Sequence, residues 1–349
     1  MSGAALTERL QAALARRAAL LREPRLEAVR WLNGVGDGVP GLLVDRLGDA
    51  RFVHAEEGAP TAALVAALRD PAVVAASGQP SPRSIWVKPL LKNVRAHAKE
   101  ELLPQLVFGE TGEAGTAGER DGDAEPEFAV QEGSWRFLVR PREGYSHGLF
   151  LDQRDNRVRL AEWLRQRAAR GGPPPTLLNT FAYTCSFSVV AAAAGARATS
   201  VDLSARYLDW GQRNFAANGL DAAAHEFARG DALTYLAIAA KKGRRFDALV
   251  LDPPTFSTSK QRGVFQVERH YDELAALAFA VAAPDALLLA SHNQRTFTRD
   301  ALVAKLHAAA RTAGRRLTRL DPFTPPADFP GPPPENPASR GFWGVVGGG

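Results

Sequence analysis

The sequence is poor in the residues that build disulfides and metal sites. Its 349 residues include a single cysteine, Cys185. One thiol excludes an internal disulfide and a zinc site built on several thiolates, because both need more sulfur than the chain has. The seven histidines form no closely spaced pair beside a carboxylate, so no metal site is predicted. Such sparse use of cysteine favours a reducing cytosol as the compartment.

Long apolar runs are also missing. No segment reaches the roughly 18 apolar residues that a membrane helix needs, and Arg16 and Arg17 interrupt the N-terminal stretch that a secretory signal would use. We therefore expect a cytoplasmic protein without a membrane span. The sequence Gly-Lys-Ser/Thr does not occur either, which disfavours nucleoside triphosphates as ligands.

Charge is unevenly distributed along the chain, whose formal net charge is +5. Residues 1–145 hold 18 basic and 20 acidic residues, whereas residues 146–349 hold 25 and 18. Seven of the acids, with one arginine, lie in residues 110–127, so the parts on either side are basic. A basic surface favours phosphate-rich partners through counterion release, although cations also keep a protein in solution.

Composition and hydrophobic patterning divide the chain into three parts. Residues 1–108 combine an amphipathic helical pattern at 6–21 with short strand-like runs, which predicts a small α+β domain with a possible RNA-binding role. Residues 109–127 have almost no large apolar side chain, and we predict a flexible loop there. Residues 128–349 form the third part, which carries the most regular pattern.

In this third part, short apolar runs alternate with alanine-rich helical stretches. Strands are predicted at 176–181, 198–201, 225–228, 247–251, 286–290 and 341–346, and helices at 187–195, 205–217, 231–241, 268–283 and 299–313. Strands separated by helices form parallel β-α-β units, so the predicted fold class is α/β with a doubly wound, Rossmann-like sheet. Such sheets bind ligands at the carboxyl ends of their strands.

Polar residues lie at or just after the ends of four predicted strands, at Asn179, Asp202, Asp231 and Asp252. An acid at the end of the second strand suits hydrogen bonding to both hydroxyls of a ribose, and Asp231 is then placed to accept from an adenine amino group. One such carboxylate alone would be an ordinary helix N-cap. The first loop lacks the glycine fingerprint that cradles phosphates, so the predicted ligand is a nucleoside without phosphate, S-adenosylmethionine.

Six segments carry a family resemblance: LDQRDNR (151–157), LNTFAYT (178–184), SVDLS (200–204), YLDW (207–210), NFAANG (214–219) and LDPPTF (251–256). They resemble class I methyltransferases acting on bacterial 23S ribosomal RNA, a group that includes cytosine-C5 and guanine-N7 enzymes. The segment GDGVPGLLVDR (36–46) is similar to their small N-terminal domain. The resemblance starts near residue 26, so the PUA module that opens some relatives is not expected.

The resemblance implies a methyltransferase whose S-adenosylmethionine pocket draws on several turns. The implied cofactor-binding residues are Phe150, Gln153, Arg154, Asn179, Phe181, Ala182, Tyr183, Thr184, Asp202, Leu203, Ser204, Asp231, Ala232 and Asp252. Relatives usually have glycine where Cys185 stands, because the backbone there closely approaches the cofactor. A cysteine fits that position if its φ angle is negative.

The resemblance also implies a base pocket formed by Asp252, Pro253, Pro254, Phe256 and Asn293. Phe256 would stack on the base, and Asn293 would bond its edge. Methylation of cytosine C5 needs a cysteine thiolate that adds to C6, and cytosine-type relatives carry this cysteine after the fifth strand. No cysteine occurs there, whereas guanine N7 has a free lone pair and needs mainly alignment. Guanine N7 is therefore the favoured target.

Two other functions stay open at this point. A small-molecule methyltransferase on the same fold is compatible with the missing PUA module and the altered first loop. A non-catalytic RNA-binding or assembly factor is compatible with Cys185 in that loop. The expected partner is ribosomal RNA or a precursor of the large ribosomal subunit, with no membrane and no metal.

Overall fold

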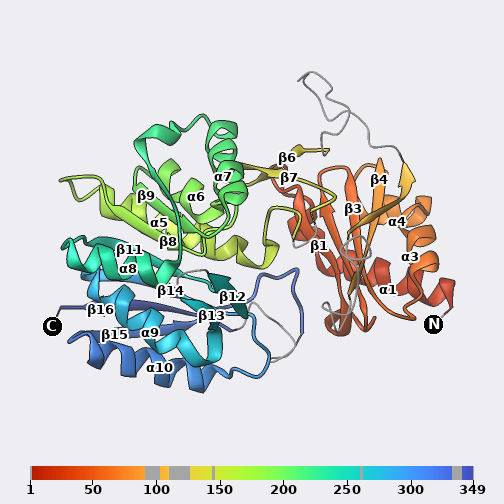
Figure 1. Ribbon diagram of the computed structural model, residues 1–349. Coiled ribbons are helices and arrows are strands. Elements are labelled where there is room, and N and C mark those ends of the chain that lie inside the picture. Colours follow the sequence, from red (N-terminus) through yellow and green to blue (C-terminus); the bar gives the residue numbers. More distant parts are fainter. Residues whose placement is uncertain are drawn as a thin grey trace. The chain divides into compact units, whose positions relative to one another are not determined.

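The computed structural model describes residues 2–90, 103–109, 126–143, 146–259, 262–331 and 340–348. They form two compact units (Figure 1). The first comprises Met1–Leu151 together with Pro326–Pro332, and the second comprises Asp152–Pro325 and Pro333–Gly349. The first unit thus extends beyond the predicted range of residues 1–108. Most of the predicted acidic loop, residues 110–125, lies outside the described residues.

The first unit is built on a five-stranded sheet in the order β1-β2-β3-β4-β5. Only β3 and β4 pair in parallel. Its elements are α1 (Gly3–Arg16), α2 (Ala18–Leu21), β1 (Ala28–Asn33), the short 3-10 helix η1 (Gly34–Asp37), β2 (Leu42–Leu47), β3 (Ala50–Glu56), α3 (Thr61–Leu68), α4 (Pro71–Ser77), β4 (Ser84–Leu90) and β5 (Gln105–Gly109).

The core of the first unit confirms the predicted amphipathic helix up to Arg16, where α1 ends; residues 18–21 form the separate short helix α2. Leu6, Leu10 and Leu14 of α1 are fully buried at four-residue spacing, and α1 packs on α3, α4 and β1. A further hairpin, β6 (Phe128–Glu132) and β7 (Trp135–Val139), contributes to this unit, since Leu26 forms a β-bridge with Glu132.

The second unit contains a seven-stranded sheet in the order β10-β9-β8-β11-β14-β16-β15, which confirms the predicted doubly wound sheet. All neighbours pair in parallel except β16, which is antiparallel to β14 and β15. The strands are β8 (Thr176–Thr180), β9 (Arg197–Asp202), β10 (Glu226–Arg229), β11 (Phe246–Leu251), β14 (Ala282–Ala290), β15 (Arg316–Pro322) and β16 (Phe342–Gly347).

Helices cover both faces of this sheet (Figure 1), so its central strands read as continuous apolar runs. One face carries α5 (Arg154–Ala168), α6 (Ser186–Ala193) and α7 (Ala205–Ala217), and the other carries α8 (Ala232–Lys241), α9 (Val267–Ala280) and α10 (Arg299–Thr312). A small hairpin, β12 (Phe256–Ser259) and β13 (Gly263–Gln266), follows β11. Across the described ranges, no helix has the length and apolar character that crossing a membrane requires.

Candidate active site

The register of the second sheet brings the carboxyl ends of its parallel strands to one edge. Thr180, the last residue of β8, pairs with Val201 of β9 and with Leu251, the last residue of β11. Leu251 in turn pairs with Ala290, the last residue of β14. The strand order changes direction between β8 and β11, and at such a switch point α/β sheets form their ligand crevice. The polar turns predicted from the sequence therefore share one edge.

The turn after β8 has an unusual backbone. Phe181, Tyr183 and Cys185 adopt φ angles of 55°, 48° and 62°, in the left-handed region that residues with a side chain seldom occupy. Strained residues of this kind cluster at functional sites, where the surrounding structure holds them. The backbone N–H of Tyr183 donates to Oδ2 of Asp202 at 2.9 Å, so the carboxylate at the end of β9 fixes this turn.

Asp202 is held by backbone donors on two sides. In addition to Tyr183, the N–H of Ser204 donates to Oδ1 at 2.8 Å, and the Leu203 amide contributes a further hydrogen bond. Burial raises the pKa of the Asp202 carboxyl, and these three hydrogen bonds oppose the rise. A carboxylate has about four acceptor positions, so capacity remains for a ribose hydroxyl. The residue therefore fits the nucleoside part of S-adenosylmethionine.

Asp231 is the N-cap of α8, and only one of its oxygens serves the cap. Oδ1 accepts from the Thr234 backbone N–H at 2.9 Å and from its hydroxyl at 3.0 Å. Within the described part of the chain, Oδ2 has no hydrogen-bond donor, although the residue is only 6% exposed. A nearly buried acceptor of this kind suits an adenine amino group, and the capping role leaves it available.

Asp252 directly follows β11 and has a perturbed carboxyl group. The Ser291 hydroxyl, which follows β14, donates to Oδ1 of Asp252 at 2.6 Å. Burial raises the pKa of the Asp252 carboxyl to about 6. The hydrogen bond from Ser291 lowers this pKa, and the negative charge of Asp152 raises it further. A carboxyl that titrates near neutrality at the ligand edge of the sheet is a candidate functional group.

Of the other predicted base-pocket residues, three follow Asp252 in the chain and the fourth, Asn293, follows β14. Pro253 is buried, while Phe256 begins β12 and is 52% exposed. Asn293 is also exposed, and its Oδ1 accepts from the Thr255 hydroxyl at 2.9 Å. This bond orients the amide so that the Asn293 Nδ2 donors face away from Thr255. Pro254, between these groups, is partly buried.

The remaining predicted cofactor residues take more indirect positions. Asn179 Nδ2 donates to Ser188 Oγ at 3.0 Å, so this side chain braces α6 against β8. Phe150 belongs to the first unit, whereas Gln153 and Arg154 belong to the second. Ala232 is the first residue of α8, and the residues on the turns after β8 and β9 are Phe181, Ala182, Tyr183, Thr184, Leu203 and Ser204.

Cys185 corrects one expectation, because its φ is +62° and not negative. The side chain is fully buried, and its Sγ donates to the carbonyl oxygen of Tyr183 at 3.6 Å. Burial raises the pKa of the thiol to about 12. A Cβ on Gly211 of α7 would lie 2.4 Å from Sγ, so the missing side chain at 211 makes room for the cysteine.

We expect Gly211→Ala to lower the free energy of unfolding by about 1–3 kcal/mol, because the new methyl group overpacks against Cys185. In a Cys185→Gly background the nearest remaining atom, the carbonyl carbon of Thr184, lies at an ordinary 3.6 Å. Urea unfolding of the wild type, both single variants and the double variant measures the coupling. An equal cost of Gly211→Ala in both backgrounds would show that this contact is not the cause.

The sequence analysis did not predict which residues interact with the predicted site residues. Ser291, Thr255 and Asp152 each modify a predicted residue through a hydrogen bond or a charge. Ser291 carried a usable signal, since it is the first polar residue after a strand. Among the described residues, no group of three or more His, Cys, Asp or Glu side chains is arranged to hold a metal ion.

Comparison with known proteins relates the chain to methyltransferases. A family model described as S-adenosylmethionine-dependent methyltransferase matches residues 116–338. "Ribosomal RNA large subunit methyltransferase K" of Neisseria meningitidis is 40% identical over 192 residues, which cover 54% of this chain and 52% of that protein. "Ribosomal RNA large subunit methyltransferase I" of Aeromonas hydrophila is 32% identical over 326 residues, covering 92% and 75%.

The chain thus spans about half the length of the first relative and three quarters of the second. Among solved structures, a SAM-dependent methyltransferase from Streptococcus mutans superposes with a TM-score of 0.76 at 23% identity, covering 99% of this chain and 81% of that one. At this level of identity the likeness concerns the fold.

Proposed function

Because this chain belongs to the S-adenosylmethionine-dependent methyltransferase family, we propose that it methylates a base of large-subunit ribosomal RNA, with guanine N7 as the target. Bound S-adenosylmethionine supplies an electrophilic methyl group on its sulfonium. The observation that carries the proposal is the common edge of the sheet. There Asp202 and Asp231 retain acceptor capacity, and Asp252 follows the adjacent strand β11.

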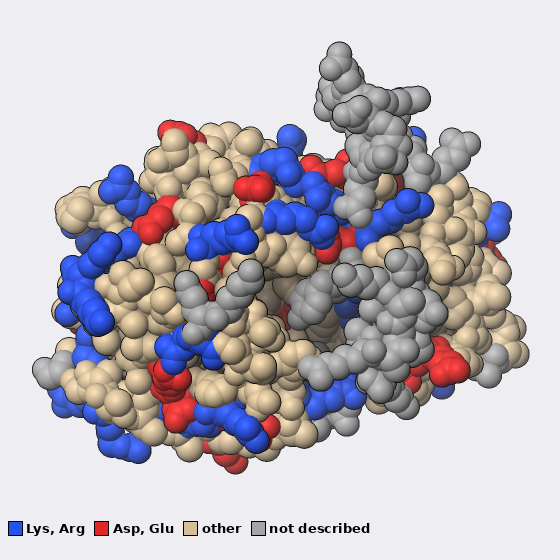
Figure 2. Space-filling view, in the orientation of Figure 1, with Lys and Arg blue, Asp and Glu red and all other residues tan. Residues whose placement is uncertain are grey.

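Several features support an RNA base as the acceptor. Both relatives named above are ribosomal RNA methyltransferases by name. The net charge of +5 suits a polyanion, and Figure 2 shows lysine and arginine side chains gathered in several groups on one face. The exposed ring of Phe256 offers a stacking platform for a base turned out of its helix. A ribosomal RNA substrate would place the reaction in the cytoplasm.

The chemistry of the only thiol supports guanine N7 over cytosine C5. Transfer to C5 requires a thiolate, but Cys185 is fully buried and its pKa is raised to about 12. Guanine N7 has a free lone pair, and no proton must leave it. Guanine presents acceptors at O6 and N7 and a donor at its amino group. The complementary groups would be the Asn293 amide as donor and, as acceptor, Asp252 Oδ2, which receives no hydrogen bond from the residues that the structure describes.

A transfer assay tests this proposal. Tritium-labelled S-adenosylmethionine is incubated with the protein and either protein-free 23S RNA, large-subunit precursors or a metabolite extract. We expect label in RNA. Label confined to small molecules would support a metabolite methyltransferase and contradict the RNA proposal. Absence of both labelling and calorimetric cofactor binding would contradict an enzyme altogether.

A thiol-free variant provides a separate prediction. We expect Cys185→Ala to keep its transfer rate within about threefold of the wild type, since a buried thiol with a raised pKa supplies no nucleophile. The rate of transfer to RNA and the dissociation constant of the cofactor should be measured together. A near-total loss of transfer with unchanged cofactor affinity would show that the thiol takes part in the reaction.

A further inference from the structure

The amino edge of the sheet in the second unit, opposite the candidate active site, carries a concentration of positive charge. At this edge the chain passes from α8 to β11, from α9 to β14 and from α10 to β15. The three connections, residues 241–247, 280–285 and 311–316, contain seven lysine or arginine residues and two aspartates. The edge lies on the left of the second unit in Figure 1, beside the label C, and Figure 2 shows lysine and arginine side chains along it.

Sheet register and hydrogen bonds place these connections next to one another. Phe246, which directly follows Arg245, pairs with Ala282 at the start of β14. Arg315 directly precedes β15, and its Nη1 and Nη2 donate to the carbonyl oxygens of Ala282 and Ala283 at 2.8 and 3.0 Å. Burial, and then the positive charge of Arg245, lower the pKa of the Arg315 guanidinium. The cations before β11 and before β15 therefore form one cluster.

Few negative charges compensate this cluster. Asp247 is paired with Arg167 at 2.9 Å, and Arg244 is paired with Glu226 at 2.8 Å. This leaves Asp285 as the uncompensated carboxylate of the three connections. The other cations of the connections form no ion pair among the residues that the structure describes, and all but one of them are exposed. We call them the amino-edge patch: Lys241, Lys242, Arg245, Arg311, Arg315 and Arg316.

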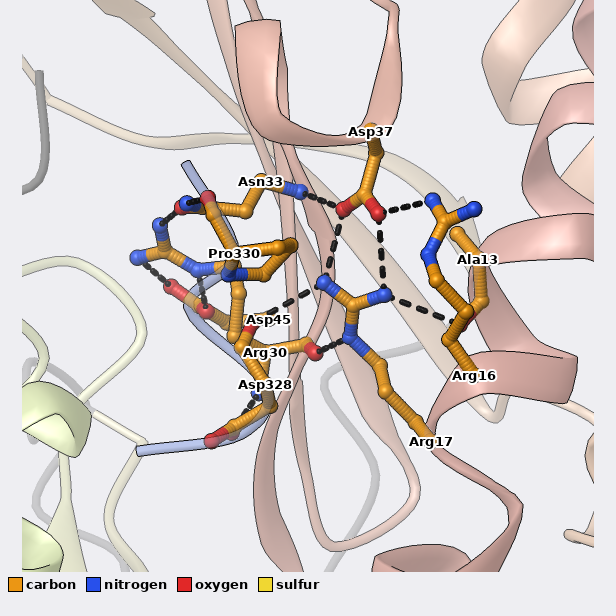
Figure 3. Close-up of polar contacts among 9 residues, drawn as sticks. All are labelled: Ala13, Arg16, Arg17, Arg30, Asn33, Asp37, Asp45, Asp328 and Pro330. Carbon is orange, nitrogen blue, oxygen red and sulfur yellow. Dashed lines mark hydrogen bonds and ion pairs between the residues drawn. The ribbon is translucent and has the colours of Figure 1, made fainter. Parts of the chain in front are cut away.

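Cations that stabilise the fold have a different environment, as Arg17 shows in the first unit (Figure 3). Its five N–H groups all donate, two of them to the carboxylate oxygens of Asp37 at 3.1 and 2.7 Å. Another bond, at 2.9 Å, reaches the carbonyl oxygen of the fully buried Asp328, which lies in residues 326–331, here called the strap. The exposed members of the amino-edge patch have no such carboxylate partner, so ion pairing within the fold does not account for them.

The helix dipole accounts for only part of the patch. A helix C-terminus carries about half a negative charge, and the ends of α8, α9 and α10 at this edge therefore attract cations. Three such ends together amount to less than two negative charges on that estimate. The six cations of the patch exceed this charge and that of Asp285 combined. The surplus gives the amino edge a positive potential toward solvent, which suits a polyanion.

We propose that the amino-edge patch binds the phosphate backbone of the RNA substrate at a distance from the methylated base. The inference rests on the proposed function, which supplies RNA as the polyanion. Strands β8 and β11 contain five and six residues, so roughly 15–20 Å of sheet separate the patch from the candidate active site. A single nucleotide is too short to reach both. The patch therefore contacts RNA that flanks the target and favours a large structured RNA over a short fragment.

The test removes three exposed cations of the patch in one variant, Lys242→Ala, Arg245→Ala and Arg316→Ala. Filter retention of transcribed 23S RNA measures the affinity at several salt concentrations. At low salt we expect binding to weaken about tenfold or more, and the slope of log affinity against log salt to fall by about 2–3, since each lost phosphate contact contributes about 0.7–0.9. The affinity for S-adenosylmethionine and kcat should not change, because these side chains lie at the other edge of the sheet.

The matched control removes the same amount of charge from ion-paired positions, with Arg159→Ala, Lys305→Ala and Arg319→Ala. In the wild type Arg159 and Arg319 pair with Asp321 at 3.1 and 2.7 Å, and Lys305 pairs with Asp272 at 3.0 Å. We expect the control to weaken RNA binding far less than the patch variant. Equal weakening in the two variants would show an effect of net charge alone and would overturn the proposal, as would a patch variant with the wild-type salt slope.

A comparison of RNA lengths tests whether the contact is remote from the reaction. The kcat/KM for a short stem-loop around the methylated base should be the same in the wild type and the patch variant, whereas kcat/KM for 23S RNA should fall through KM. An equal loss with both RNAs would contradict a remote contact. A wild type that labels no RNA would defeat the proposed function, while filter retention, which needs no methyl transfer, would still decide whether the patch binds RNA.

Discussion

Replacing Asp202 by alanine is expected to weaken the binding of S-adenosylmethionine by about 100-fold or more, because hydrogen bonds to a charged group contribute about 1.5–3 kcal/mol each. The substitution has a second effect on the protein itself. The Tyr183 and Ser204 amides lose their acceptor, at 2.9 and 2.8 Å in the wild type. The turn that contains three left-handed residues then loses its main restraint.

Isothermal titration calorimetry measures this loss directly. Asp221→Ala is the matched control, because Asp221 caps a short 3-10 helix through the Ala223 N–H and lies away from the carboxyl edge of the sheet. We expect the control to bind the cofactor like the wild type. If Asp202→Ala bound with nearly wild-type affinity, the assignment of Asp202 to the nucleoside would be wrong.

The second large effect concerns Asp252 and pH. Because its pKa is raised to about 6, the carboxyl becomes protonated as the pH falls below that value and loses an acceptor that the base requires. The wild-type kcat/KM should therefore decline about tenfold per pH unit below pH 6 and level off above pH 7. Asp252→Asn should lower the neutral-pH rate by about 100-fold, because the base is no longer aligned.

The asparagine variant should also lose the acid limb of the pH profile. An acid limb that persisted in Asp252→Asn would assign the ionisation to another group. The same pKa predicts how the free energy of unfolding changes with pH. The Asp252 carboxyl has a higher pKa in the folded than in the unfolded protein, so its contribution to stability is present at low pH, where it is protonated. This contribution is lost as the pH rises through about 6. Asp252→Asn should thus be more stable than the wild type at neutral pH although it is less active.

The sequence predicted the elements whose burial is two-sided. Strands β8, β9, β11 and β14 consist mostly of buried residues, and α7 begins and ends at the predicted residues 205 and 217. β15 escaped prediction because it is an edge strand with mostly exposed side chains, which leaves no apolar pattern to detect. The β12–β13 hairpin is short and polar, and the strap is buried only by residues distant in sequence.

The same distinction applies to the candidate site, where some residues could be predicted from local sequence and others depend on tertiary neighbours. Asp202, Asp231 and Asp252 could be predicted because a strand end is visible in the sequence and the register of parallel strands then aligns them. The hydrogen bond from Ser291 and the conformation of Cys185 could not. Each depends on a tertiary neighbour, and for the cysteine that neighbour is an absent side chain at Gly211.

Mass mapping of the modified nucleoside tests the central claim most directly. Ribosomal RNA lacking the modification is incubated with the protein and S-adenosylmethionine, digested, and analysed by liquid chromatography and mass spectrometry against authentic methylated nucleosides. The account predicts 7-methylguanosine, formed equally by the Cys185→Ala variant. Formation of 5-methylcytidine, lost in that variant, would contradict it.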